Sequence, residues 1–176
     1  MRLLLAACFL IQLAATDCCA AHTVEGVVRA VYDGDTILLV TRGTSRLKTR
    51  LYGVDAPETA KPDKPGQPFG AAARRLLLSK IMGKKVSAEV IDVDQYQRAV
   101  AVIRYAGRDI NREMVAEGMA WAYRQYLQGP YASEYLGAES RARSRRAGLW
   151  RDVNPRPPWE FRQALNNGQR PGRQRR

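Results

Sequence analysis

The order of strand-like and helical segments constrains the fold of this chain more than any other feature. Strand-like segments lie on both sides of one helical segment, and two further helical segments follow them. The expected strands cover residues 23–32, 36–41, 46–54, 85–93 and 98–105, and the expected helices cover residues 69–82, 109–119 and 130–147. The chain is therefore expected to combine one small sheet with packed helices in an α+β arrangement.

Five short strands with a helix inserted after the third are typical of a small closed barrel. The alternation within residues 46–54 supports this interpretation, because Leu47 and Leu51 fall on one face and Arg50 on the other. We therefore expect a five-stranded OB-fold β-barrel with three packed α-helices.

Helix boundaries are marked by a few residues. Gly83 is the expected stop of the first helix, and Asp109 is an N-cap candidate for the second. Pro130 and Gly148 are the expected start and end of the third helix. The prolines of residues 59–68 predict a loop ahead of the first helix.

The charge of the chain indicates a class of partner. It carries 29 Lys and Arg residues against 17 Asp and Glu residues, a formal net charge of +12. Such a surface attracts polyanions, namely nucleic acid, anionic lipid or acidic glycans. An Arg-rich composition without a polyanionic ligand is the alternative.

Residues 1–20 resemble a signal peptide. Arg2 supplies a positive charge, residues 3–15 are apolar, and small residues precede a plausible cleavage after Ala20. The apolar stretch is too short to span a bilayer. Leu5-Ala6-Ala7-Cys8 also resembles a lipoprotein box, but an apolar region ending at Ala7 would be too short. We therefore expect a secreted or periplasmic protein with no stable membrane association.

Removal of this leader would leave the protein few types of side chain for catalysis or metal binding. All three cysteines lie within it, and the one histidine, His22, lies next to the expected new N-terminus. Disulfides, thiolate chemistry, a histidine base and a multi-histidine metal site are thereby excluded. Any catalysis is expected to use carboxylates, arginines and a metal ion.

Carboxylates and arginines gather in three short runs. These runs are Asp33-Gly34-Asp35-Thr36, Arg50-Leu51-Tyr52-Gly53-Val54-Asp55-Ala56-Pro57-Glu58 and Asp94-Gln95-Tyr96-Gln97-Arg98. They supply the groups that metal-assisted cleavage of a phosphodiester needs: carboxylates for a hard cation, a carboxylate for a water proton, and guanidinium groups for phosphate.

In the first run, Asp35 is expected to begin a strand with its carboxylate directed at a cation, and Gly34 to permit a sharp turn. Asp33 is a ligand, a neighbour of the ligands or a turn residue. An acidic hairpin turn without a metal is the alternative.

In the second run, Pro57 fixes the backbone between two carboxylates, and the residue before it is extended. Asp55 and Glu58 are therefore held at a defined offset, where carboxylates, a backbone carbonyl and waters suit Ca²⁺. The same spacing could cap a helix, although the prolines that follow argue against a helix at this point.

In this order and spacing, the three runs resemble the staphylococcal nuclease (thermonuclease) family. The resemblance extends over residues 24–150, through Asn111 to Ala120, Ala138-Glu139, Ala142-Arg143 and Gly148-Leu149-Trp150. It implies a nuclease domain over residues 23–150 that hydrolyses DNA and RNA, single-stranded or locally frayed, and leaves 3′-phosphate ends.

The resemblance also implies the role of each site residue. Asp35, Asp55 and the Ala56 carbonyl correspond to Ca²⁺ ligands, and Glu58 to the residue that orients or deprotonates the attacking water. Arg50 and Arg98 correspond to the arginines that bind the scissile phosphate. Tyr123 and Tyr126 lie in the region that stacks a base in the family, and Tyr123 could equally belong to the core.

One departure affects the geometry of this site. Gln97 stands where the family usually has glycine before the second arginine. If the turn needs positive φ, Gln97 costs about 1 kcal/mol or shifts the turn, which changes the direction of Arg98.

Beyond residue 150 the composition changes. Residues 154–159 are expected to be stiff and extended, and residues 166–176 contain no apolar residue. We interpret residues 151–176 as a Pro/Arg-rich basic tail that is partly disordered. The chain as a whole is predicted to be a monomeric Ca²⁺-dependent nuclease, with a non-catalytic nucleic-acid-binding module and a lipid-surface protein as the alternatives.

Overall fold

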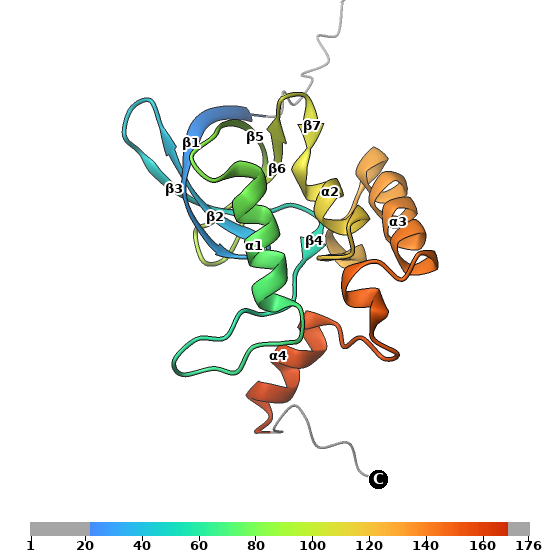
Figure 1. Ribbon diagram of the computed structural model, residues 1–176. Coiled ribbons are helices and arrows are strands. Elements are labelled where there is room, and N and C mark those ends of the chain that lie inside the picture. The colour runs from blue at the N-terminus through green and yellow to red at the C-terminus, as the bar shows by residue number, and fades with distance from the viewer. Residues whose placement is uncertain (1–21, 169–176) are drawn as a thin grey trace, which may run out of the picture.

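The computed structural model describes residues 22–168, and a closed five-stranded barrel forms its centre (Figure 1). The barrel strands are β1 (His22–Asp33), β2 (Thr36–Thr41), β3 (Arg46–Leu51), β5 (Lys85–Val93) and β6 (Ala99–Tyr105). β1 pairs with β2 and β5, β2 pairs with β3, and β5 pairs with β6, all antiparallel. β3 then pairs in parallel with β6 and closes the barrel. The predicted OB-fold barrel is confirmed.

Helices and short strands surround this barrel. The helices are α1 (Gly70–Ile81), α2 (Ile110–Ala116), α3 (Gly129–Ser144) and α4 (Pro158–Asn166), and the short strands are β4 (Val54–Asp55), β7 (Arg108–Asp109) and β8 (Trp121–Ala122). Two 3₁₀ turns, η1 (Arg124–Tyr126) and η2 (Gly148–Arg151), complete the described residues. Three helices were predicted, and the structure has a fourth. None of the helices within residues 22–168 is both long enough and apolar enough to cross a bilayer.

β1 is bent and pairs with a different neighbouring strand along each of its two halves. Its first half pairs with β5 and its second half pairs with β2. Register shifts between Val28 and Ala30, and between Val31 and Asp33, interrupt the pairing with β2. Such bulges bend a strand and increase its twist, which allows a small sheet to close.

The prediction of one strand over residues 46–54 is wrong at its end. β3 stops at Leu51, and the chain turns at Gly53, whose φ is 69°. A Cβ atom at this glycine would collide with the Leu127 side chain. The chain then leaves the barrel as β4, which pairs with β8. Asp55 consequently lies at the junction between the barrel and the helices.

Asn111, at the start of α2, fixes this turn to the barrel. Its fully buried amide donates to the carbonyl oxygens of Tyr52 and Ala101, each at 3.0 Å. Its Oδ1 accepts from the amide of Ile103 at 3.0 Å. The side chain thereby satisfies backbone groups where the regular ladder stops.

The predicted starts of the three helices are correct to within one residue, and so is the end of α1, which Gly83 follows with φ of 71°. Asp109 caps α2, accepting from the Arg112 amide at 2.9 Å. Pro130 lies in the first turn of α3. However, α2 ends at Ala116 and α3 at Ser144, and Gly148 begins η2 instead of ending α3.

The expectation of an extended stretch through residue 159 is wrong from Pro158 onward, where α4 begins. Pro158, Phe161 and Ala164 are buried on one side of this helix. Trp159 packs against a small second core that contains Trp121 and Trp150. In Figure 1, α4 lies beside the loop that precedes α1. The leader and residues 169–176 of the expected tail lie outside the described residues.

Gly34 has a different role from the one expected. It does not adopt positive φ. Instead, a Cβ atom at this position would lie 2.7 Å from the Cβ atoms of both Ala56 and Ala73. The turn between β1 and β2 therefore packs directly against α1 and against the segment after β4, with no room for a side chain.

We expect Gly34→Ala to lower the free energy of unfolding by about 1–3 kcal/mol, because two neighbours on separate elements would have to move. Urea unfolding measures this change. Gly43→Ala is the matched control, since nothing lies within 4 Å of a Cβ atom there. Equal losses from the two substitutions would contradict the packing explanation.

Candidate active site

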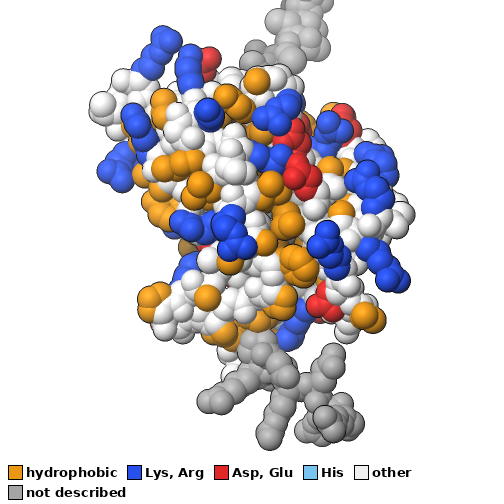
Figure 2. Space-filling view, viewed as in Figure 1, with side chains coloured by type: hydrophobic (Ala, Val, Ile, Leu, Met, Phe, Trp, Pro, Cys, Tyr) orange, Lys and Arg blue, Asp and Glu red, His pale blue; other side chains and the backbone are white. Residues whose placement is uncertain are grey.

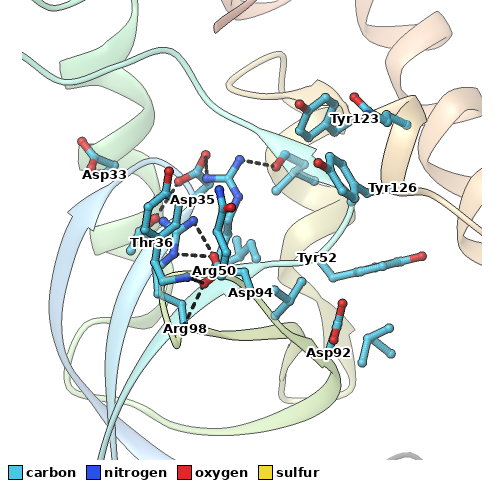
Figure 3. Close-up of a pocket in the computed structure, with 18 of the residues that line it drawn as sticks. Asp33, Asp35, Thr36, Arg50, Tyr52, Asp92, Asp94, Arg98, Tyr123 and Tyr126 are labelled. Atoms are coloured by element: carbon cyan, nitrogen blue, oxygen red, sulfur yellow. Dashed lines mark hydrogen bonds and ion pairs between the residues drawn. The ribbon is translucent and has the colours of Figure 1, made fainter. Parts of the chain in front are cut away.

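A cavity of about 850 Å³ opens where the β1–β2 turn, the end of β3, the β5–β6 turn and η1 meet. The predicted site residues that line it are Asp35, Arg50, Glu58, Arg98, Tyr123 and Tyr126. Figure 3 shows Asp35, Arg50 and Arg98 close together, with Tyr123 and Tyr126 side by side across the cavity. The structure thus gathers side chains from all three sequence runs.

At the centre of the site, Arg50 joins two carboxylates. Its Nη1 lies 3.0 Å from Asp35 Oδ2, and its Nη2 lies 2.7 Å from Asp55 Oδ1. Nη2 also donates to the Val54 carbonyl at 3.3 Å. The Asp55 side chain is fully buried, and Asp35 is nearly so. Buried carboxylates require such partners, since an unpaired buried charge is costly.

Strand pairing and one backbone hydrogen bond produce this arrangement. Arg50 lies opposite Thr36 in the β2–β3 register, next to Asp35. The Ala56 amide donates to Asp35 Oδ2 at 3.0 Å, which ties the segment after β4 to the β1–β2 turn. Thr36 donates its hydroxyl to the other oxygen, Asp35 Oδ1, at 2.8 Å.

The electrostatics of Arg50 follow from this pairing. Burial disfavours its charged form, but the negative charges of Asp35 and Asp55 outweigh burial and raise the pKa of Arg50 above its ordinary value. The guanidinium therefore stays charged at every pH at which the protein is folded.

Glu58 is held by its backbone. Its amide donates to Gln67 Oε1 at 3.0 Å, and its carbonyl accepts from the Gln67 amide at 2.8 Å. The loop before α1 therefore folds back onto Glu58 and leaves its carboxylate on the cavity wall. The alternative that Asp55 and Glu58 cap a helix is wrong, because α1 begins at Gly70 with Phe69 as its N-cap.

Arg98 is oriented by a carboxylate of its own turn. Its Nε donates to Asp94 Oδ2 at 2.7 Å, and its Nη2 lies 2.6 Å from the same oxygen. Asp94 Oδ1 accepts from the amides of Tyr96 and Arg98. Burial would raise the pKa of Asp94, but the hydrogen bonds from Arg98 and Tyr96 outweigh it and lower the pKa.

The turn that carries Arg98 does need positive φ. Gln97 has φ of 58°. Its amide donates to the Asp94 carbonyl at 2.9 Å, and the Asp94 amide donates to the Arg98 carbonyl at 3.0 Å. The turn is therefore kept despite the side chain, with Gln97 in a conformation that favours glycine.

The two tyrosines differ in availability. Tyr123 stacks flat on Trp159, with ring centroids 5.2 Å apart and an interplanar angle of 2°. Tyr126 meets Tyr123 edge to face, and 54% of Tyr126 is exposed. The Tyr126 ring is consequently the more exposed of the two to solvent, whereas α4 covers one face of the Tyr123 ring.

Two carboxylates, Asp35 and Asp55, therefore point at one positive charge beside the cavity. Oxygen donors of this kind fit a hard cation, with water completing the coordination. Within residues 22–168, no group of three or more His, Cys, Asp or Glu side chains is arranged to hold a metal. Asp33 also lines the cavity; its Oδ2 pairs with Lys61 Nζ at 3.3 Å, and among the described residues its buried Oδ1 has no hydrogen-bond partner.

Comparisons with known proteins agree with this geometry. The chain is 40% identical over 153 residues to a micrococcal nuclease of Shigella flexneri, covering 81% of this chain and 83% of that protein. It is 37% identical over 161 residues to an uncharacterized endonuclease of Haemophilus influenzae, covering 92% and 85%. A family model described as "Staphylococcal nuclease homologue" matches residues 48–152.

The chain belongs to the staphylococcal nuclease family. It is therefore a nuclease, a hydrolase, and the alternatives of a non-catalytic binding module and a lipid-surface protein are set aside. The family match includes Arg50, Asp55, Glu58 and Arg98, while Asp35 lies before it.

One residue of this nuclease site was missed by the sequence interpretation. Arg162, on α4, lines the cavity and lies beyond the family match. Burial disfavours its charged form, but hydrogen bonds and the charge of Asp55 raise its pKa above the ordinary value. The apolar spacing of Pro158, Phe161 and Ala164 could have indicated the helix, but nothing in that spacing indicates the contact of Arg162 with the site.

Gln97→Gly is expected to raise the free energy of unfolding by up to about 1 kcal/mol, because it removes the cost of positive φ at a side-chain-bearing residue. Urea unfolding of the variant nuclease measures the gain. Gln95→Gly is the matched control in the same turn, where φ is not positive, and it should lower stability. A loss of stability in Gln97→Gly as large as that in the control would contradict the backbone argument.

Proposed function

We propose that this nuclease is a Ca²⁺-dependent endonuclease that hydrolyses DNA and RNA with low sequence specificity and leaves 3′-phosphate ends. One observation carries the proposal: Arg50 joins buried Asp55 to Asp35, and Asp35, Arg50, Glu58 and Arg98 line one cavity. This arrangement supports the proposal because a cation, a water and a phosphate would each find suitable groups within one site.

The cation would be held by Asp35, Asp55 and the carbonyl of Ala56. Two carboxylates and a carbonyl leave several positions to water, which suits the flexible coordination of Ca²⁺. A bound cation would supply positive charge that polarises the phosphoryl group and makes a water easier to deprotonate.

The remaining steps fall to side chains on the cavity wall. Glu58 orients the attacking water and accepts its proton at a carboxylate oxygen. Arg50 and Arg98 donate to the phosphoryl oxygens and stabilise the negative charge that grows on them in the transition state. Asp94 supports this role of Arg98, because it holds the guanidinium through Nε and Nη2 and leaves Nη1 for the phosphate.

The substrate is inferred to be single-stranded or locally frayed. The exposed ring of Tyr126 offers a stacking surface that only an unstacked base can reach, and such stacking tolerates any sequence. Lys and Arg side chains are spread over the face in Figure 2 and gather on the side where α3 lies. A polyanion would bind this surface with an affinity that falls as salt rises.

The location and assembly of the nuclease are also proposals. The leader of residues 1–20 supports export, with cleavage after Ala20, and hence a secreted or periplasmic enzyme. We also propose that the enzyme acts as a monomer. The nuclease domain is proposed to cover residues 23–150.

Digestion of denatured DNA tests the function. We expect cleavage with Ca²⁺, none with excess chelator, and a loss of about a hundredfold or more in kcat for Glu58→Gln, because the water loses its proton acceptor. Asp63→Asn is the matched control, an acidic residue of the loop that follows Glu58 and outside the cavity lining, and should cleave at the rate of wild type.

Two outcomes would contradict parts of this proposal. Cleavage that persists unchanged with excess chelator would exclude the metal requirement. Wild-type kcat in Glu58→Gln, with the metal requirement intact, would remove only the role given to Glu58.

A further inference from the structure

Arg162 reaches from α4 into the site and contacts two of its carboxylates. Its Nη1 donates to Asp55 Oδ1 at 3.1 Å and its Nη2 to Asp55 Oδ2 at 2.9 Å. Nη1 also donates to Glu58 Oε1 at 2.8 Å. The Arg162 guanidinium therefore forms a bidentate ion pair with Asp55 and a further hydrogen bond with Glu58.

This contact comes from a helix that is firmly docked. Phe161 and Ala164 are 4% and 2% exposed, and Trp159 stacks flat on Tyr123. Just before the helix, Gln67 Nε2 donates to the Arg156 carbonyl at 3.1 Å, and the same Gln67 side chain accepts from the Glu58 amide. α4 is thus joined to the active-site loop through contacts that do not involve the Arg162 guanidinium.

Both oxygens of Asp55 accept from Arg162 in this arrangement. Oδ1 accepts from both Arg50 and Arg162, and Oδ2 accepts from Arg162. A divalent cation that takes a ligand from Asp55 would meet the positive charge of Arg162 at the same oxygens. Arg50 contacts Oδ1 of Asp55 alone, whereas Arg162 contacts both oxygens, so Arg162 is the cation whose position and charge oppose a metal at Asp55.

We propose that Arg162 is a further positioning residue of the active site. Its guanidinium, attached to α4, orients Asp55 and Glu58 and competes with the divalent cation for Asp55. This inference rests on the proposed Ca²⁺-dependent function. Since the Arg162 side chain is 38% exposed, it can turn toward solvent while α4 stays docked. The helix beyond the family domain therefore sets the metal affinity of the site.

Calorimetric titration with Ca²⁺ tests this proposal on the whole chain after leader removal. We expect Arg162→Gln to bind Ca²⁺ about tenfold more tightly than wild type or better, because the competing charge is gone. Arg162→Lys keeps the positive charge but loses the bidentate contact with Asp55. Its Ca²⁺ affinity should therefore lie between those of wild type and Arg162→Gln. Arg156→Gln is the matched control and should match wild type, because this arginine of the same segment hydrogen-bonds the Glu160 carbonyl and no site carboxylate among residues 22–168.

Thermal unfolding separates competition from a structural role. Without Ca²⁺, Arg162→Gln should have a lower Tm than wild type, because buried Asp55 loses a partner. Saturating Ca²⁺ should then raise the Tm of Arg162→Gln more than that of wild type, since the variant binds the ion more tightly. A merely structural arginine would lower the Tm equally with and without Ca²⁺.

The possible failures are distinguishable. If wild type binds Ca²⁺ and Arg162→Gln binds it with equal or lower affinity, competition is overturned while the proposed function stands. If neither protein binds Ca²⁺ and neither requires it for cleavage, both the metal-dependent function and the competition are overturned.

Discussion

A partly buried guanidinium, that of Arg50, holds Asp35 and Asp55 together, and the rest of the site depends on this contact. Burying either carboxylate without such a partner would cost free energy of folding. The contact also fixes relative positions, because Asp35 belongs to the β1–β2 turn, Arg50 to β3 and Asp55 to β4. One side chain thereby joins three segments and concentrates negative charge beside a cavity, where a cation and a phosphate can meet.

The barrel supports this contact by ending β3 early. The turn at Gly53 directs β4 away from the barrel, and Asn111 replaces the lost ladder hydrogen bonds. Gly34 allows the β1–β2 turn to approach Ala56 and α1 without a side chain between them. The site therefore lies at a junction of elements and not within a strand, which leaves Glu58 and Arg98 on the cavity wall.

Much of this could be predicted from the sequence, because local patterns decide it. β2 and β5 have the predicted bounds, Asp109 caps α2, and the positive φ at Gln97 was foreseen as a condition of its turn. The break at Gly53 was not foreseen, since the alternation of side chains continues through it. α4 and Arg162 were missed because prolines and basic residues resembled a tail, and because a contact between Arg162 and Asp55 depends on packing across the whole domain.

The central claim is that Asp35 and Asp55 form the cation site and that Arg162 gives way to the cation. A crystal structure of the Ca²⁺-bound protein, with the ion identified by anomalous scattering, tests it most directly. The account predicts Ca²⁺ on carboxylate oxygens of Asp35 and Asp55 at about 2.3–2.6 Å, Arg50 still beside them, and Arg162 turned away while α4 stays docked. Ca²⁺ bound elsewhere, or bound at Asp55 with both hydrogen bonds of Arg162 intact, would contradict it.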